Sequence, residues 1–271
     1  MCELLGMSSN RCTTINLSLS VLAKRGENPS LHGDGWGVAF YEGKDVRLIK
    51  DSGAAKESPW VELIKKQEIQ SHDVIAHIRK STVGEVSYRN THPFIRELKG
   101  RVHTFAHNGT FVNILEDSRF TPEFYRPVGT TDSEHAFCFL MDRMKEIWNS
   151  HDEVPSLDAR LEVVQKFAAE MRNLGPTNFL YSDGETLFAH GHKRHDPITQ
   201  EIAWPGLYYI HLPDEKKAHE FEKSRKSGIS VKSDHDLVTL FASVPLKEGD
   251  WHPLKEGETI AVTKGEIRFC S

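Results

Sequence analysis

Apolar residues recur along this chain in short runs closed by glycine or Asp-Gly, and in longer stretches with a period of about 3.6 residues. The short runs of the first half predict strands at residues 2–6, 35–41, 46–50, 74–78 and 102–106. Between the second and third runs lies Glu42-Gly43-Lys44, which predicts a hairpin turn.

Stretches with helical spacing predict helices at residues 16–24, 58–67, 132–147 and 157–174. Ser58-Pro59 supplies an N-cap and a first helical residue for the second of them. Asp132 or Ser133 is expected to cap the third. The fourth is expected to stop at Gly175-Pro176.

The last third of the chain again shows strand patterns with turn residues between them. They cover residues 178–182, 186–190, 207–211, 237–244, 259–262 and 266–269. Residues 214–226 mix both signs of charge and predict a solvated helix or loop. Strands, then two helices, then strands predict an α+β layered fold, and the length fits one domain over residues 1–271.

Composition and charge narrow the classes of function. The chain is 38% hydrophobic and 27% charged, as in ordinary globular proteins, and its net charge of -5 comes with no evident basic patch. We therefore expect neither nucleic acid nor an anionic membrane as a partner. The N-terminus lacks a secretory signal and the apolar runs are too short to span a membrane, so a cytoplasmic protein is expected.

The cysteines are scattered and form no CxxC pair, which favours reduced thiols over a zinc site or a disulfide framework. Cys2 follows the initiator Met1, and removal of Met1 would place its thiol beside a free α-amine. An α-amine titrates at about 7.7–8.0 and can accept a thiol proton near neutral pH. Cys2 is thus either a nucleophile with its own base or a small packing residue.

Five segments, in this order, resemble the class II glutamine amidotransferases, which are N-terminal-nucleophile hydrolases. They are Cys2, His77-Ile78-Arg79-Lys80-Ser81-Thr82, Asn90-Thr91-His92-Pro93, His107-Asn108-Gly109 and Thr131-Asp132-Ser133-Glu134. MCELLG, AHNG and RPVGTTDSE look especially like the stand-alone YafJ-type members. The resemblance implies a four-layer αββα sandwich of two antiparallel sheets flanked by helices, with Cys2 as the nucleophile.

The resemblance also implies roles that suit the hydrolysis of a γ-glutamyl amide. Arg79 would bind the α-carboxylate of glutamine through its guanidinium fork, and Asp132 the α-ammonium group. The Asn108 amide and the Gly109 N–H would form the oxyanion hole. The alternatives for these segments are a surface salt bridge, a helix N-cap and an Asn-Gly hairpin turn.

Thr82 and Val83 lie where family members touch the substrate. The chain departs from synthase-linked members at Lys80, where they commonly carry Trp, and at Val83, where they commonly carry His. Gly33-Asp34-Gly35-Trp36-Gly37 is not a phosphate loop, and we interpret it as tight backbone packing beside the site.

The histidines are expected to serve structure. His92 and His107 are interpreted as positioning loops through hydrogen bonds. His190, His192 and His195 lack a carboxylate or cysteine to complete a ligand set, so no metal and no cofactor are expected.

Together these features predict a glutaminase-type enzyme that forms a Cys2 thioester and releases ammonia. About 130 residues follow the motifs and read as completion of the same fold, so any ammonia-accepting synthase would be a separate subunit. Hydrolysis of another γ-glutamyl small molecule is an open alternative. If Met1 is retained, the α-amine is blocked, and a catalytically silent γ-glutamyl-binding protein becomes the alternative.

Overall fold

The computed structural model describes most of the chain. The described residues are 2–15, 33–81, 83–150, 153–195, 201–212, 231–232, 237–246 and 250–271. The helix expected at residues 16–24 and the charged segment at residues 214–226 lie outside them.

One antiparallel sheet contains the N-terminal strand. Its order is β14-β11-β13-β1-β4-β2-β3, and β12 also pairs with β1. The strands are β1 (Glu3–Ile15), β2 (Trp36–Glu42), β3 (Asp45–Asp51), β4 (Gln70–Ile78), β11 (Tyr208–Leu212), β12 (Val231–Lys232), β13 (Val238–Ala242) and β14 (His252–Pro253). The hairpin expected around Gly43 joins β2 and β3, so that prediction is confirmed.

The second antiparallel sheet has the order β16-β15-β8-β7-β6-β5. Its strands are β5 (Phe94–Leu98), β6 (Arg101–Gly109), β7 (Thr177–Ser182), β8 (Leu187–His190), β15 (Thr259–Thr263) and β16 (Glu266–Cys270). A separate ribbon pairs β9 (Arg194–His195) with β10 (Ile202–Ala203). The strand β5 carries Arg96 and Glu97 between its apolar residues and was not predicted.

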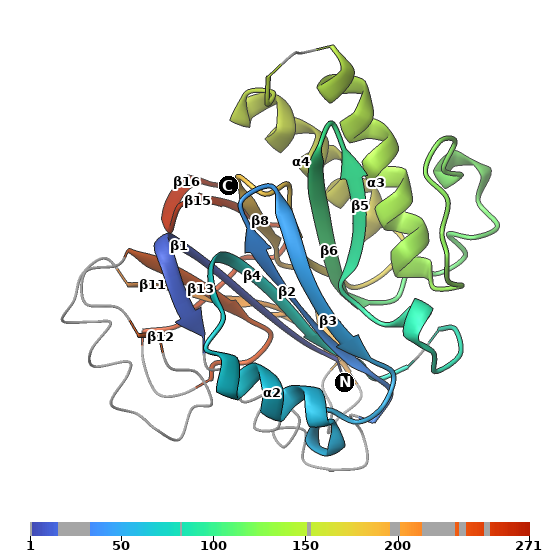
Figure 1. Cartoon of the computed structure of the whole chain (residues 1–271). Helices are drawn as coiled ribbons and strands as arrows, with labels where there is room; N and C mark the ends of the chain where they lie inside the picture. Colours follow the sequence, from blue (N-terminus) through green and yellow to red (C-terminus); the bar gives the residue numbers. More distant parts are fainter. Residues whose placement is uncertain are drawn as a thin grey trace.

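Helices cover the outer faces of both sheets, as Figure 1 shows. The two long helices, α3 (Asp132–Asn149) and α4 (Leu157–Arg172), lie against the sheet of β5 to β8, and α2 (Pro59–Gln67) lies against the sheet of β1 to β4. Short 3₁₀ turns occur at Ala55–Glu57, Tyr88–Asn90 and Ser118–Phe120. The two-sheet α+β sandwich that the resemblance implies is therefore confirmed.

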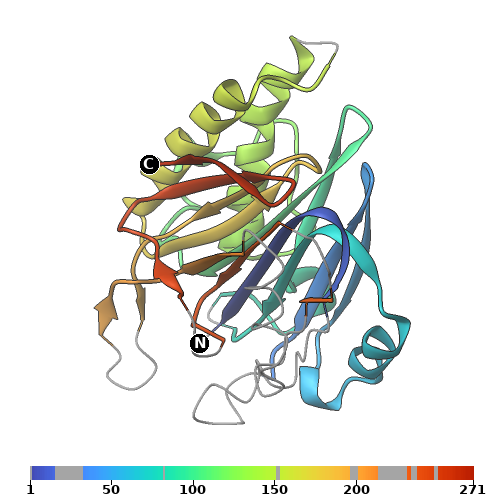
Figure 2. The ribbon, with the colours of Figure 1, turned by 90° about the vertical axis from the view of Figure 1, so that its left-hand side faces the viewer.

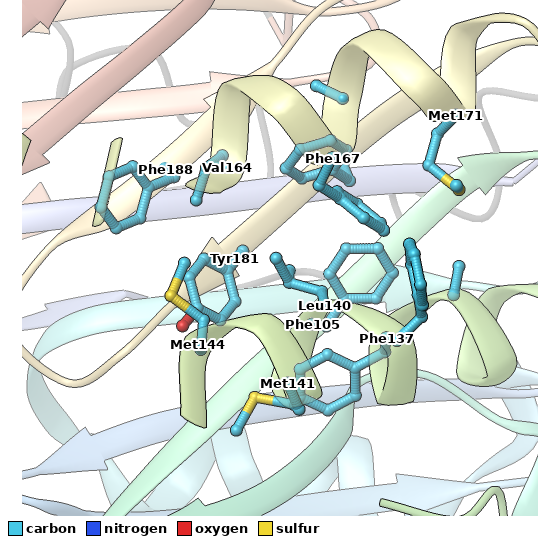
Figure 3. Packing of buried hydrophobic residues seen from close by; sticks show 14 of the residues in the cluster. Phe105, Phe137, Leu140, Met141, Met144, Val164, Phe167, Met171, Tyr181 and Phe188 are labelled. Carbon is cyan, nitrogen blue, oxygen red and sulfur yellow. The ribbon is translucent and has the colours of Figure 1, made fainter. Parts of the chain in front are cut away.

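The core has three parts because both sheets are buried on both faces. Along β1, Leu5 and Met7 face α2, whereas Leu4 faces the other sheet. The space between the sheets is filled by Leu4, Ile75, Ala106, Leu180, Leu187, Ala189, Leu207, Phe241, Leu254, Ile260 and Val262. Figure 3 shows the third part, in which Phe105 packs against Phe137 and Phe167 of the long helices and Tyr181 stacks on Phe188.

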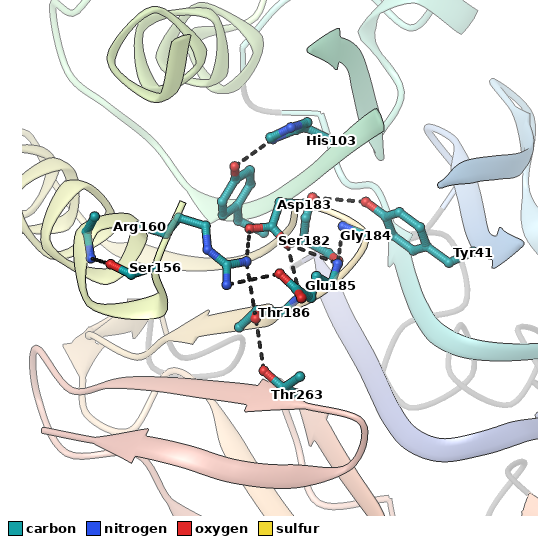
Figure 4. A network of polar contacts seen from close by, with 12 residues as sticks. Tyr41, His103, Ser156, Arg160, Ser182, Asp183, Gly184, Glu185, Thr186 and Thr263 are labelled. Atoms are coloured by element: carbon teal, nitrogen blue, oxygen red, sulfur yellow. Dashed lines mark hydrogen bonds and ion pairs between the residues drawn. The ribbon is translucent and has the colours of Figure 1, made fainter. Parts of the chain in front are cut away.

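A polar network closes the end of the strands opposite Cys2 (Figure 4). Arg160 of α4 pairs with Asp183, at 2.7 Å between Nη1 and Oδ2, and Asp183 accepts the Thr186 N–H. Tyr41 of the first sheet donates to the Ser182 carbonyl of the second at 2.9 Å. These bonds tie the two sheets and α4 together at this end.

The caps of α2 and α3 were both predicted, and the cap of α3 differs from its prediction. Thr131, and neither Asp132 nor Ser133, is the N-cap of α3, because its side chain accepts the Glu134 N–H at 3.2 Å. Asp132 is the first helical residue. Ser58 is the N-cap of α2 and Pro59 its first residue, as predicted, although the Ser58 hydroxyl donates to Asp51 and makes no cap bond.

Candidate active site

Strand alternation brings the candidate residues to one end of the space between the sheets. Successive side chains of a strand point to opposite faces, so Cys2 faces the same way as Leu4, and Arg79 the same way as Ile75. In the other sheet Asn108 shares the inward face of Ala106. The pairing of Glu3 with Ile78 sets Arg79 beside the start of β1.

Cys2 is half-buried and bound on two sides. Its Sγ donates to the Lys80 carbonyl at 3.2 Å and accepts the Lys80 N–H at 3.1 Å. Its own carbonyl accepts the Asn108 side-chain amide at 2.7 Å. Burial raises the pKa of the Cys2 thiol, while the Lys80 N–H and the charge of Arg79 oppose that rise. The thiol form is therefore favoured at neutral pH.

Asn108 and Gly109 end β6 and do not form a hairpin turn, since they pair with Asn178 and Thr177 of β7. The turn alternative is therefore wrong. A Cβ on Gly109 would lie 1.8 Å from the Pro176 carbonyl oxygen, so only glycine fits this close approach.

Arg79 is buried, at 3% exposure, which rules out the surface salt bridge considered for it. Its guanidinium donates to the side chain of Ser81 and to four backbone carbonyls, those of Asp34, Val83, Gly84 and Glu85. Burial lowers the pKa of Arg79, and the charges of Cys2, Asp34 and Asp132 raise it. These three groups therefore lie within electrostatic reach of the guanidinium.

Two further predicted residues follow Arg79. Val83 provides one of the carbonyls just described, at 3.0 Å from Arg79 Nη2. Thr82 lies outside the described residues.

Asp132 begins α3 with a buried carboxylate. Oδ2 accepts the Phe111 N–H at 2.7 Å and Oδ1 accepts the Ser133 N–H at 2.9 Å. Burial raises the pKa of Asp132, and these backbone donors oppose the rise. The carboxylate thus joins the start of α3 to the segment just after Gly109.

Three buried histidines, His77, His92 and His107, lie in the sequence segments that carry the candidate residues. Burial lowers the pKa of His77 and of His107 to about 3, and that of His92 well below its usual value, so all three are neutral near pH 7. His107 bonds the Ser133 hydroxyl at 2.9 Å, as expected. The expectation was wrong for His92: both ring nitrogens lack a hydrogen-bond partner, and the ring packs on His77 at 4.3 Å between centroids.

Comparison with known protein families shows which family the chain belongs to. The model of the class II glutamine amidotransferases matches residues 1–271. The chain belongs to this family. The chain is 38% identical over 270 residues to YafJ of Escherichia coli strain K12, covering 98% of this chain and 99% of YafJ. It is 36% identical over 267 residues to a Haemophilus influenzae protein assigned as a glutamine amidotransferase, covering 98% and 85% of the two chains.

Solved structures agree with this amidotransferase fold. A predicted glutamine amidotransferase from Pseudomonas aeruginosa PA01 has a TM-score of 0.70 at 34% identity, over 99% of this chain and 100% of that one. The glutamine phosphoribosylpyrophosphate amidotransferase of B. subtilis has a TM-score of 0.59 at 12% identity, over 100% of this chain and 49% of that one. The second likeness concerns the fold alone.

Several residues at the candidate site were not singled out from the sequence. Asp34 accepts the Ser81 N–H at 2.8 Å through Oδ2, and Asn90 accepts the Thr130 N–H at 2.8 Å through Oδ1. Asn90 lies in one of the five motifs and Asp34 in the Gly33–Gly37 segment, and these segments were the available signal. Arg194 and Ser243 also reach Glu3, Leu4 and Asn108, and no motif indicated them.

The Gly33–Gly37 segment packs as expected. Gly35 accepts the Arg79 N–H at 2.8 Å, and a Cβ on Gly37 would lie 2.3 Å from the His92 carbonyl oxygen. Within the part of the chain that the structure describes, no three His, Cys, Asp or Glu side chains form a metal-binding group. Across the same residues, no helix is long and apolar enough to cross a membrane.

Proposed function

We propose that this amidotransferase hydrolyses the γ-amide of glutamine, or of another γ-glutamyl small molecule, with Cys2 as its N-terminal nucleophile. The observation that carries the proposal is the 2.7 Å bond from the Asn108 amide to the Cys2 carbonyl. It joins the proposed oxyanion donor and the proposed nucleophile, although they lie on different sheets. A thiol and an amide donor next to each other suit acyl transfer.

The proposed reaction has two stages. The Cys2 sulfur bonds to the γ-carbonyl carbon, its proton passes to the α-amine, and the Asn108 amide and Gly109 N–H stabilise the oxyanion. The amine then protonates the leaving group, ammonia or an amine departs, and a γ-glutamyl thioester is left. Water cleaves the thioester, which gives glutamate and regenerates the thiol.

The remaining predicted residues would hold the substrate. Arg79 would bind the α-carboxylate, which would take over acceptor positions that Ser81 and the backbone carbonyls now fill. Asp132 would bind the α-ammonium, and Thr82 and Val83 would contact the substrate chain. Because each carboxylate oxygen has two lone pairs, the bonds from Phe111 and Ser133 leave acceptor capacity on Asp132.

The wider proposal is a single amidotransferase domain over residues 1–271 that needs no cofactor. A reactive thiol must stay reduced, which favours a reducing compartment such as the cytoplasm. Released ammonia would serve a separate synthase subunit or diffuse away. Comparing ammonia release from glutamine with cleavage of γ-glutamyl peptides identifies the preferred substrate.

Reaction with an electrophilic glutamine analogue, followed by peptide mapping, tests the nucleophile. We expect the label on Cys2, and we expect Cys2→Ala to abolish both labelling and hydrolysis. Cys12→Ala is the matched control, because Cys12 is an exposed thiol of β1, the strand that Cys2 precedes, and this variant should behave as wild type. Label on Cys12, or full activity of Cys2→Ala, would refute the mechanism.

The intact mass of the protein made in cells separates an enzyme from a silent binding protein. Loss of Met1 exposes the α-amine that the mechanism needs. A mass that includes Met1, with glutamine binding but no turnover, supports the silent alternative.

A further inference from the structure

Ser243 follows β13 and lies at the nucleophile end of the inter-sheet space. Its side chain points inward, as that of Phe241 does, and is fully buried. Its hydroxyl oxygen accepts the Leu4 N–H at 2.9 Å and the Asn108 amide at 3.3 Å. Its own N–H donates to the Leu4 carbonyl at 3.1 Å. One serine thus binds both the N-terminal strand and the proposed oxyanion donor.

The Asn108 amide is oriented by two acceptors. Its nitrogen lies 2.7 Å from the Cys2 carbonyl oxygen and 3.3 Å from the Ser243 hydroxyl oxygen. An amide has two N–H groups, so two acceptors in different directions fix the plane of the group. The longer bond is the weaker one, and its hydrogen is the one that an oxyanion can share.

Arg194 holds Ser243 and the start of β1 from the other side. Its guanidinium donates to the Ser243 carbonyl and pairs with Glu3 at 3.5 Å between Nη2 and Oε1. The side chains of Arg194 and Glu3 are only 12% and 11% exposed, so solvent screens the pair weakly. Figure 2 shows the N-terminal end close to strands of the last third of the chain.

The segment that carries Arg194 is itself fixed to the second sheet. Asn178 of β7 donates to the Lys193 carbonyl at 2.8 Å and accepts the His192 N–H at 2.8 Å. A Cβ on Gly206 would lie 2.0 Å from Asn178 Oδ1, so glycine leaves the room that this side chain occupies. Arg194 is therefore held at a defined place.

We infer that Ser243 and Arg194 are positioning residues for the nucleophile. Ser243 holds the Cys2 end of β1 and sets the plane of the Asn108 amide, and Arg194 holds Ser243 and Glu3. The inference rests on the proposed function, because positioning has a rate consequence only if Cys2 reacts. It assigns a role at the site to the C-terminal part of the chain.

Ser243→Ala tests this role in the full-length protein. We expect kcat for hydrolysis to fall about 10-fold with KM little changed, because Arg79 and Asp132 hold the substrate independently of Ser243. Ser71→Ala is the matched control: Ser71 is equally buried in the same sheet, bonds two backbone carbonyls, and lies at the other end of the strands. An unchanged kcat in Ser243→Ala, or an equal loss in Ser71→Ala, overturns the inference.

A double-mutant cycle with Asn108→Ala asks whether Ser243 acts through that amide. Adding Ser243→Ala to Asn108→Ala should lower kcat by less than about twofold, because the group that Ser243 orients is gone. Fully multiplicative losses contradict this. Arg194→Met should lower kcat as Ser243→Ala does, and Arg194→Lys should restore part of it by keeping the charge opposite Glu3. Equal loss in both Arg194 variants counts against the proposed contact.

Hydrogen exchange separates this inference from the proposed function. In Ser243→Ala the Leu4 amide loses its acceptor, so exchange of the N-terminal peptide should be faster than in wild type and in Ser71→Ala. If the wild type hydrolyses no γ-glutamyl compound, the proposed function fails, and exchange alone decides whether Ser243 holds β1. Unchanged exchange of that peptide overturns the positioning role in either case.

Discussion

Cys2 occupies a place that disfavours its own ionisation. Burial raises the pKa of the thiol, and the Lys80 N–H and Arg79 only partly offset it. A protonated thiol needs a base during attack, and in the proposed mechanism this base is the α-amine that removal of Met1 exposes. The activity should therefore follow the titration of that amine.

We predict that kcat/KM rises with pH through an inflection at about 7.7–8.0, because the α-amine must lose its proton before it can accept one from the thiol. Stopped assays of hydrolysis across the pH range measure this. Protein prepared with Met1 retained should lose at least about 100-fold in kcat. An undiminished rate with Met1 in place would exclude the α-amine as the base.

Asn108 has a proposed catalytic role and an observed structural contact, and one substitution removes both. Asn108→Ala should lower kcat about 10²–10³-fold, equivalent to about 2.7–4 kcal/mol of transition-state stabilisation. It should also lower stability, because the Cys2 carbonyl loses its donor. Steady-state kinetics and denaturant titration separate the two effects. Asn149→Ala, at the exposed end of α3, is the control and should change neither.

At the scale of elements, the start of α3 positions the Asp132 carboxylate, which is proposed to bind the substrate. Thr131 caps the helix through the Glu134 N–H, and Asp132 follows as the first helical residue. Glu134, also in the first turn, pairs with Arg96 of β5 at 2.6 Å. The position of the Asp132 carboxylate thus depends on how this helix begins.

Two capping substitutions compare local stability with function. Thr131→Ala and Ser156→Ala, the cap of α4, should each cost about 1 kcal/mol of unfolding free energy. Only Thr131→Ala should raise KM for glutamine, because only α3 begins at the site. Denaturant titration and steady-state kinetics measure the two quantities. A similar KM in the two variants would show that the cap does not position Asp132.

At the scale of the whole molecule, the two sheets meet around groups that titrate. Asp73 of β4 is buried, its Oδ1 lacks a partner, and burial raises its pKa to about 7. A hydrogen bond from Ser8 lowers that pKa, and the charge of Asp183 on the other sheet raises it. Because the folded state holds this proton more tightly than the unfolded state, stability from this group is complete below about pH 4 and falls as pH rises through about 7.

Asp73→Asn should remove that loss. We expect the variant to gain about 4 kcal/mol relative to wild type at about pH 8.5, and little or nothing at about pH 4. Urea denaturation at both pH values measures the difference. A gain of the same size at both would mean that packing, and not the charge of Asp73, causes the effect.

The sequence by itself determined most of the elements and indicated the family. Alternation and helical spacing depend only on neighbours along the chain, so β2, β3, α2, α3 and α4 were predicted near their observed bounds. β5 was missed because Arg96 and Glu97 interrupt its apolar pattern. The order of the five motifs indicated the family, because each motif is a short contiguous segment that can be recognised without the fold.

Only the tertiary structure decided which groups meet. The contacts of Asn108 with Cys2 and of Ser243 with Leu4 join residues 106 and 239 positions apart, and local patterns carry no record of such distances. The path of the loop after Arg79 brings backbone carbonyls against the Arg79 guanidinium. The extended backbone of Thr131 makes this residue, and not Asp132, the N-cap of α3. Strand parity gives the face of each side chain; the packing of two sheets decides its partner.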